Sequence, residues 1–99
     1  IDVRFLKNPH WDENLKPLTG QNDKVGAYIE KDANFAPFFN KFTDMVDFLI
    51  PAYEAEGKSY LTIAIGCTGG KHRSVYMAES LKSFFEKKGL SPSVKHRDL

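Results

Sequence analysis

Cysteine is nearly absent from this 99-residue sequence, because Cys67 is its only one. A lone cysteine excludes an internal disulfide framework and a multi-cysteine zinc site, and we expect no metal site. Long hydrophobic runs are also missing, which excludes a transmembrane span, and no signal-peptide pattern opens the chain. We therefore expect a cytoplasmic protein. The chain begins at Ile1 rather than at methionine, so we interpret it as a fragment of a longer protein.

An excess of charge of one sign is missing too, since 14 Lys and Arg stand against 13 Asp and Glu. A net charge of +1 argues against a strongly basic nucleic-acid binder. The average hides an asymmetry, because residues 1–70 carry a net −3 and residues 71–99 a net +4. The basic last third could be an RNA or phosphate-backbone patch, although such charges are usually only a solvated helix face. The hydrophobic content of 41% is sufficient for one domain over residues 1–99.

Apolar residues that recur every three or four positions predict three helices, over residues 21–31, 35–53 and 75–88. Asn34 is placed to cap the second helix, and Pro51 should kink or divide it. Gly89 should end the third. The aromatic residues of the second helix are expected to face the core, although they could as easily serve a subunit contact, and we expect a homo-oligomer. A domain that serves only for oligomerisation is a weaker alternative.

Three β-prone segments complete the predicted architecture, over residues 1–6, 60–65 and 93–96. The middle segment is almost continuously apolar, which is typical of a central parallel strand. Strand, glycine-rich turn, helix and strand together form a right-handed βαβ unit. The sequence therefore predicts an α/β fold, a small three-layer domain with a mainly parallel sheet.

The glycine-rich turn at residues 66–74 is the most informative stretch, because ligands of open α/β sheets bind beyond the carboxyl ends of strands. Its glycines let backbone N–H groups approach a ligand, and the following helix start favours an anion. A phosphate, sulfate or carboxylate fits these donors, although the spacing is not that of a P-loop. The residues expected to bind it are Thr68, Gly69, Gly70, Lys71, His72, Arg73 and Ser74.

Cys67 and Arg73 also match the minimal signature of cysteine-dependent phosphatases, a cysteine followed after five residues by arginine and then serine. In such an enzyme a thiolate would attack phosphorus, and Asp12 would be the candidate general acid. Gly66 stands where those enzymes usually carry histidine. We favour the alternative that Cys67 is a small residue packing the base of an anion loop.

His10 follows the first predicted strand. If that strand is parallel to residues 60–65, His10 emerges at the same sheet edge as the glycine-rich turn and could touch the ligand. A loop histidine bonded only to local backbone is equally compatible with the sequence.

Four stretches of the sequence together resemble the C-terminal domain of the RapZ/YvcJ family, the bacterial RNase adapter proteins also described as nucleotide-binding proteins. They are DVRFLKNPHW at residues 2–11, PLTG at 17–20, GKSYLTIAIGCTGGKHRSV at 57–75 and KHRDL at 95–99. The resemblance covers essentially the whole chain. It implies that an N-terminal P-loop domain, which binds and hydrolyses ATP or GTP, is absent here, and that this domain needs no cofactor and is not an enzyme.

The resemblance further implies a pocket for the amino-sugar phosphate glucosamine-6-phosphate, formed by His10 with Thr68, Gly69, His72 and Arg73. It also implies binding of small regulatory RNA, which the domain helps to present to the endoribonuclease RNase E. The basic residues proposed for the RNA are Lys87, Lys88, Lys95 and Arg97.

Overall fold

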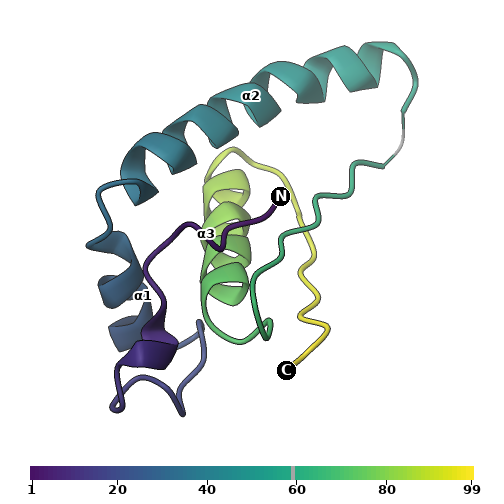
Figure 1. Ribbon diagram of the computed structural model, residues 1–99. Coiled ribbons are helices and arrows are strands. Elements are labelled where there is room, and N and C mark those ends of the chain that lie inside the picture. The colour runs from purple at the N-terminus through teal and green to yellow at the C-terminus, as the bar shows by residue number, and fades with distance from the viewer. Residues whose placement is uncertain (59) are drawn as a thin grey trace.

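The structure is a computed structural model that describes residues 1–58 and 60–99. Within these residues a short 3₁₀ turn is followed by three α-helices, in the order η1 (Pro9–Trp11), α1 (Asp23–Glu30), α2 (Phe35–Ala55) and α3 (Arg73–Lys87). The beginning of α2 and all of α1 lie along one side of α3 (Figure 1). The far half of α2 extends beyond the rest, which gives the molecule its elongated dimensions of 48 × 26 × 22 Å.

The three predicted helices are confirmed. Helix α1 begins where the side chain of Asn22 accepts a hydrogen bond of 2.9 Å from the Lys24 N–H, a typical N-cap. Helix α2 differs in two details, since Asn34 makes no side-chain capping bond and the helix continues through Pro51 to Ala55. Helix α3 ends as predicted, because Gly89 has a φ of +84°, a left-handed conformation that favours glycine.

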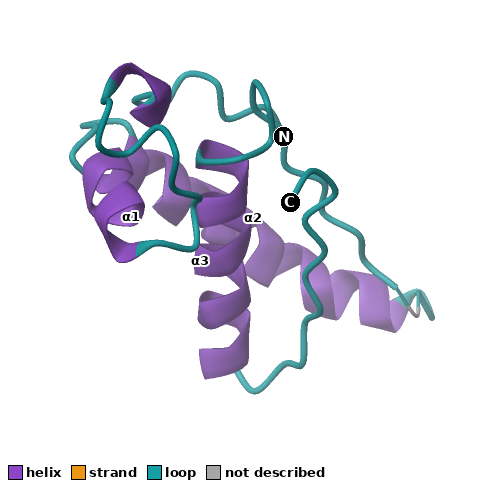
Figure 2. Ribbon diagram, turned by 90° about the horizontal axis from the view of Figure 1, so that it is seen from below, coloured by secondary structure: helices purple, strands orange, loops and turns teal. Residues whose placement is uncertain are grey.

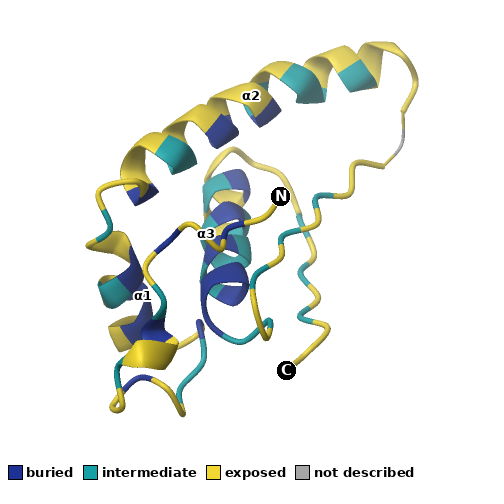
Figure 3. Cartoon of the chain, in the orientation of Figure 1, coloured by how far each residue is buried: buried dark blue, intermediate teal, exposed yellow. Residues whose placement is uncertain are grey.

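The core lies where the inner faces of the three helices meet the N-terminal segment (Figure 3). Val3, Val25, Ile29 and Met77 are fully buried in it. Removing a side chain of this size from water stabilises a fold by about 1.5–3 kcal/mol. The aromatic residues of α2 contribute from one side, and Phe39 packs edge-to-face on Phe84 of α3 with ring centroids 6.1 Å apart. The expectation that these aromatics face the core is confirmed for the first half of α2.

The predicted α/β fold is wrong, because no strand or sheet forms in the described part of the chain (Figure 2). The segments predicted as strands are residues 1–6, 60–65 and 93–96. All three lie outside regular secondary structure except for one isolated parallel bridge between Asp2 and Gly66. The domain is therefore helical, with irregular segments packed along α3.

The N-terminal segment does not continue as a strand because its backbone groups find other partners. Just beyond the bridge to Gly66, the Asp2 carboxylate accepts a 2.9 Å hydrogen bond from the Arg4 N–H. The buried Arg73 guanidinium then donates to the carbonyls of Arg4 and Leu6, at 2.6 and 3.1 Å. A neighbouring strand would need those same carbonyls, so side-chain competition ends the ladder after one pair.

The other two predicted strands do not pair with each other in the described residues, although the Ala64 carbonyl accepts a 2.7 Å hydrogen bond from the amino group of Ile1. No backbone hydrogen bond joins residues 60–65 to 93–96 within the residues described, and Tyr60 and Leu61 are exposed to solvent. The C-terminal segment instead returns along α3, where His96 Nε2 lies 2.7 Å from Glu79 Oε2. Apolar β-prone residues form a strand only when their backbone N–H and C=O groups are paired with those of a neighbouring strand. The contact between His96 and Glu79 holds the C-terminal segment against α3 but pairs none of its backbone groups.

Candidate functional site

A pocket of about 490 Å³, lined mostly by residues with polar side chains, lies between the loop that carries η1 and the glycine-rich turn before α3. Two segments more than fifty residues apart in the sequence supply its walls. The lining residues are Asn8, His10, Trp11, Lys16, Thr68, Gly69, Lys71 and His72. Two of them are lysines and none is acidic, so the pocket favours a negatively charged ligand.

The glycine-rich turn reverses the chain just before α3. Gly69 and Gly70 have φ values of +80° and +62°, a left-handed conformation that other residues adopt at a cost. Gly70 is also confined by the C-terminal segment, because a Cβ there would lie 2.5 Å from Asp98 Oδ2. The turn therefore places Thr68 and Gly69 at the pocket while its next residues begin the helix.

The Lys16 carbonyl ties the two walls together. It accepts hydrogen bonds from Lys71 Nζ at 3.0 Å and from His72 Nε2 at 3.2 Å, and the second bond requires the proton on Nε2. Burial and the adjacent Lys71 charge lower the pKa of His72, and the bond to Lys16 only partly opposes them. His72 is thus a neutral hydrogen-bond donor near pH 7, and Lys16 and Lys71 carry the positive charge of the pocket.

The 3₁₀ turn η1 fixes the opposite wall. The Asn8 side chain caps it by accepting a 3.1 Å bond from the His10 N–H, and Pro9 is buried beneath it. His10 and Trp11 are left at the surface with their rings edge-to-face, 5.4 Å between centroids. The structure thus brings His10 to the same pocket as Thr68, Gly69, Lys71 and His72.

Arg73 is placed elsewhere. Its side chain points to the Arg4 and Leu6 carbonyls, and the residue is only 5% exposed and does not line the pocket. Arg73 therefore acts as a brace between α3 and the N-terminal segment. By holding that segment, it positions the loop that follows with His10.

Cys67 has part of the chemistry of a phosphatase nucleophile but not its surroundings. Burial alone would raise the pKa of its thiol, but hydrogen bonds from the side chain and backbone of Ser74 and the backbone of Gly70, with Arg73 nearby, lower it below its usual value. The Ser74 N–H donates to the Cys67 sulfur at 3.3 Å. Ser74, which the sequence predicted to bind an anion, thus has a partner within the protein. The guanidinium needed for phosphate is committed to the Arg4 carbonyl. An arrangement for phosphoryl transfer is therefore not assembled.

Asp12, the candidate general acid, caps a turn of its own loop. Its carboxylate accepts a 2.9 Å hydrogen bond from the Asn14 N–H, and the residue is not part of the pocket lining. The structure gives it a local structural contact rather than a partner near Cys67.

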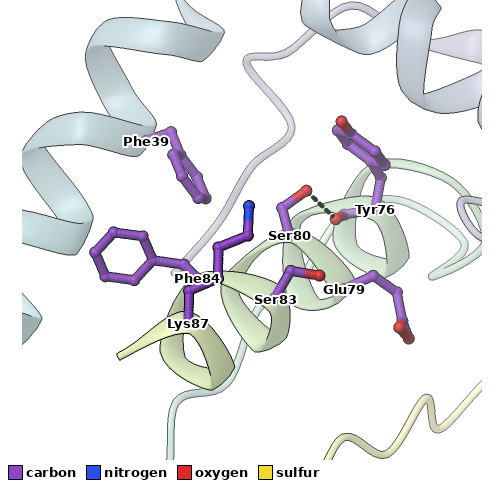
Figure 4. Close-up of a pocket in the computed structure, with 7 residues that line it drawn as sticks. All are labelled: Phe39, Tyr76, Glu79, Ser80, Ser83, Phe84 and Lys87. Carbon is purple, nitrogen blue, oxygen red and sulfur yellow. Dashed lines mark hydrogen bonds between the residues drawn. The ribbon is translucent and has the colours of Figure 1, made fainter. Parts of the chain in front are cut away.

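The basic residues proposed for RNA lie along α3 and the segment that follows. Lys88 pairs with Asp47 at 2.9 Å, and Arg97 lies 3.6 Å from Asp98. Lys95 is exposed. Lys87 lines a second cavity of about 390 Å³ between α2 and α3, where its ammonium reaches back along α3 (Figure 4). Its other lining residues are Phe39, Tyr76, Glu79, Ser80, Ser83 and Phe84.

Sequence reasoning missed three of the pocket residues, Asn8, Trp11 and Lys16. A signal for two of them exists, since an asparagine before Pro-His-Trp is typical of a capped turn and a tryptophan in a polar loop is unusual. Lys16 has no such signal, because its position depends on how the loop folds back on the glycine-rich turn.

The fold and the pocket define a small helical domain with a cation-lined polar site built from two loops. The family model described as the RapZ C-terminal domain matches residues 1–99, so the chain belongs to that family. It is 54% identical over 99 residues to a nucleotide-binding protein of Rhodospirillum rubrum, and 50% identical over 99 residues to one of Geotalea daltonii. The whole chain is matched in both cases but covers only 31% and 35% of those proteins, about a third of their length.

Across residues 1–58 and 60–99, none of the helices combines the length and the apolar character that crossing a membrane requires.

Proposed function

We propose that this domain is a non-catalytic binding domain that takes a phosphorylated amino sugar, glucosamine-6-phosphate, into the pocket between η1 and the glycine-rich turn. The observation that carries the proposal is the composition of the pocket, with Lys16 and Lys71 as cations and no acidic residue in its lining. The hydroxyl of Thr68 and the imidazole of His10 add hydrogen-bonding groups, whereas the single ring N–H of neutral His72 is taken by the Lys16 carbonyl. Phosphate is well matched by such a set of ammonium, hydroxyl and ring N–H donors.

The size of the pocket supports a small ligand. Its volume of about 490 Å³ falls within the usual range of small-molecule sites. The amino-sugar part of the proposal comes from the RapZ family, to which the chain belongs. The phosphate part is supported independently by the charges of the pocket.

Glucosamine-6-phosphate should bind the parent protein in isothermal titration calorimetry, and Lys71→Ala should weaken binding about tenfold or more. The reason is the loss of a charged hydrogen bond to phosphate, worth about 1.5–3 kcal/mol. Lys41→Ala is the matched control, since Lys41 is exposed on α2 and does not line the pocket. A parent protein that does not bind, or equal losses in both variants, would contradict the proposal.

We also propose that the domain binds small regulatory RNA and helps to present it to RNase E. Membership of the RapZ family and the net +4 of residues 71–99 support this second function. Lys87 and Lys95 are both exposed, whereas Lys88 and Arg97 lie beside the Asp47 and Asp98 carboxylates. Lys95 is the better residue to test, because Lys87 also lines the cavity between α2 and α3.

Charge reversal by Lys95→Glu should therefore weaken RNA binding and reduce its salt dependence by about one phosphate contact. Fluorescence anisotropy with a labelled RNA hairpin at several salt concentrations measures both quantities. Lys24→Glu, an exposed reversal on α1, is the control and should have the smaller effect. If the binding constant of Lys95→Glu depends on salt concentration as steeply as that of the parent, the RNA does not contact Lys95.

A further inference from the structure

Trp11 contributes a large aromatic side chain to the lining of this pocket. It is 80% exposed, although tryptophan is usually largely buried in folded proteins. Packing in the core does not explain this residue, because its ring contact is with its neighbour His10. What distinguishes Trp11 from other exposed aromatic residues is that it lines the pocket, where its indole offers a large contact surface to a ligand.

The backbone that carries the indole is held in place before any ligand arrives. Trp11 is the last residue of η1, whose turn is capped by Asn8 and anchored by buried Pro9. The edge-to-face contact with His10, at an interplanar angle of 84°, further restricts the ring. A preorganised aromatic surface costs little conformational entropy when it contacts a ligand.

The pocket therefore has two chemically different parts. Lys16, Lys71 and Thr68 suit a phosphate, whereas Trp11 offers no charge and suits an apolar surface. The C–H face of a sugar ring is such a surface, and inorganic phosphate has none.

We propose that Trp11 is the specificity-determining residue of this pocket, providing the surface on which the ring of a sugar phosphate stacks while the lysines hold its phosphate. This inference rests on the proposed sugar-phosphate function and deepens it. Trp11 selects for the sugar ring, and the cations select for the phosphate. Trp11 thereby makes the pocket discriminate a hexose phosphate from free phosphate.

The test compares three probes by calorimetry, namely glucosamine-6-phosphate, glucose-6-phosphate and inorganic phosphate. Trp11→Ala should weaken both sugar phosphates about tenfold and leave inorganic phosphate unchanged, and Trp11→Phe should restore most of the loss. Phe48→Ala is the matched control, because Phe48 is 75% exposed on α2 and does not line the pocket. It should bind like the parent.

Trp11 is the only tryptophan in the sequence, so its fluorescence reports on this residue alone. Emission should change with glucosamine-6-phosphate and not with inorganic phosphate. If the parent binds the sugar phosphates but Trp11→Ala binds them equally well, the role of Trp11 is overturned and the proposed function stands. If all three probes lose affinity equally in Trp11→Ala, the residue shapes the pocket without selecting the ring. A parent protein that binds no sugar phosphate overturns both.

Discussion

Replacing Gly20 by alanine should lower the free energy of unfolding by about 3 kcal/mol, the upper part of the usual range for overpacking. Gly20 is buried where its loop crosses the start of α3, and its N–H donates to the Lys71 carbonyl at 2.9 Å. A Cβ at this position would lie 2.3 Å from the His72 carbonyl oxygen and 2.5 Å from the Tyr76 nitrogen. Both are backbone atoms of the start of α3, so no side-chain rotation can relieve the clash. The loop must move away from the helix.

Urea denaturation measures this loss, and Gly66→Ala is the control. A Cβ at Gly66 meets nothing within 4 Å, and its φ is not in the left-handed region, so the change should be below about 1 kcal/mol. The displaced loop also carries Lys16, which lines the pocket. Gly20→Ala should therefore bind sugar phosphate more weakly even where it remains folded. Equal stability of the two alanine variants would show that the loop does not pack on α3 as described.

Arg73→Ala should cost about 2–4 kcal/mol of stability, because hydrogen bonds from a charged group contribute about 1.5–3 kcal/mol each and are not fully additive. The guanidinium is buried and donates to two carbonyls of the N-terminal segment, at Arg4 and Leu6. Truncation leaves these carbonyls without their donor and opens a cavity against α3. Arg73→Lys should recover part of the loss, since an ammonium can still donate but lacks the planar shape that fills the site.

Arg97→Ala is the matched control, because that side chain is 89% exposed and should change stability by less than about 0.5 kcal/mol. Thermal and urea unfolding should be measured together with ligand affinity. The brace described above predicts a loss of stability in Arg73→Ala. A variant as stable as the parent but unable to bind phosphate would show instead that Arg73 is a ligand-binding residue, as the sequence suggested.

The helices could be predicted from the sequence because their periodicity coincides with their burial. Phe35, Phe42 and Val46 recur along α2 and are all buried, and the same holds for Leu81 and Phe85 in α3. Local backbone conformation and one apolar face are sufficient to specify such an element. This is also why the end of α3 was predicted correctly.

The sequence predicted a sheet that does not form in the described residues, because strand pairing depends on distant partners. The apolar, β-branched character of residues 60–65 indicates that they can form a strand, but not that the carbonyls of Arg4 and Leu6 will be taken by a side chain from position 73. Propensity is local, whereas the competition for a carbonyl is decided by tertiary structure.

The sequence places His10 at the glycine-rich turn only on the condition that two strands run parallel, and a loop histidine bonded to local backbone is equally compatible with it. In the described residues one bridge of that pairing forms. The bridge between Asp2 and Gly66 is nevertheless enough to set the N-terminal segment beside the glycine-rich turn. His10 then meets Thr68 and His72 at the pocket, as the parallel arrangement predicted. The direction of the Arg73 side chain, in contrast, follows from burial that the sequence does not reveal.

The hydrogen bond between the Lys16 carbonyl and His72 joins two residues that are 56 positions apart in the chain. No local segment can form the pocket in advance, so its assembly requires closing a loop that contains α1 and α2, and the entropy lost in that closure must be offset by the packing of the helices. Ligand that binds only the closed loop shifts this balance toward the folded chain. The proposed sugar phosphate should therefore raise resistance to unfolding, and a mutation in the helical core far from the pocket should weaken the apparent affinity once it leaves an appreciable fraction of the chain unfolded.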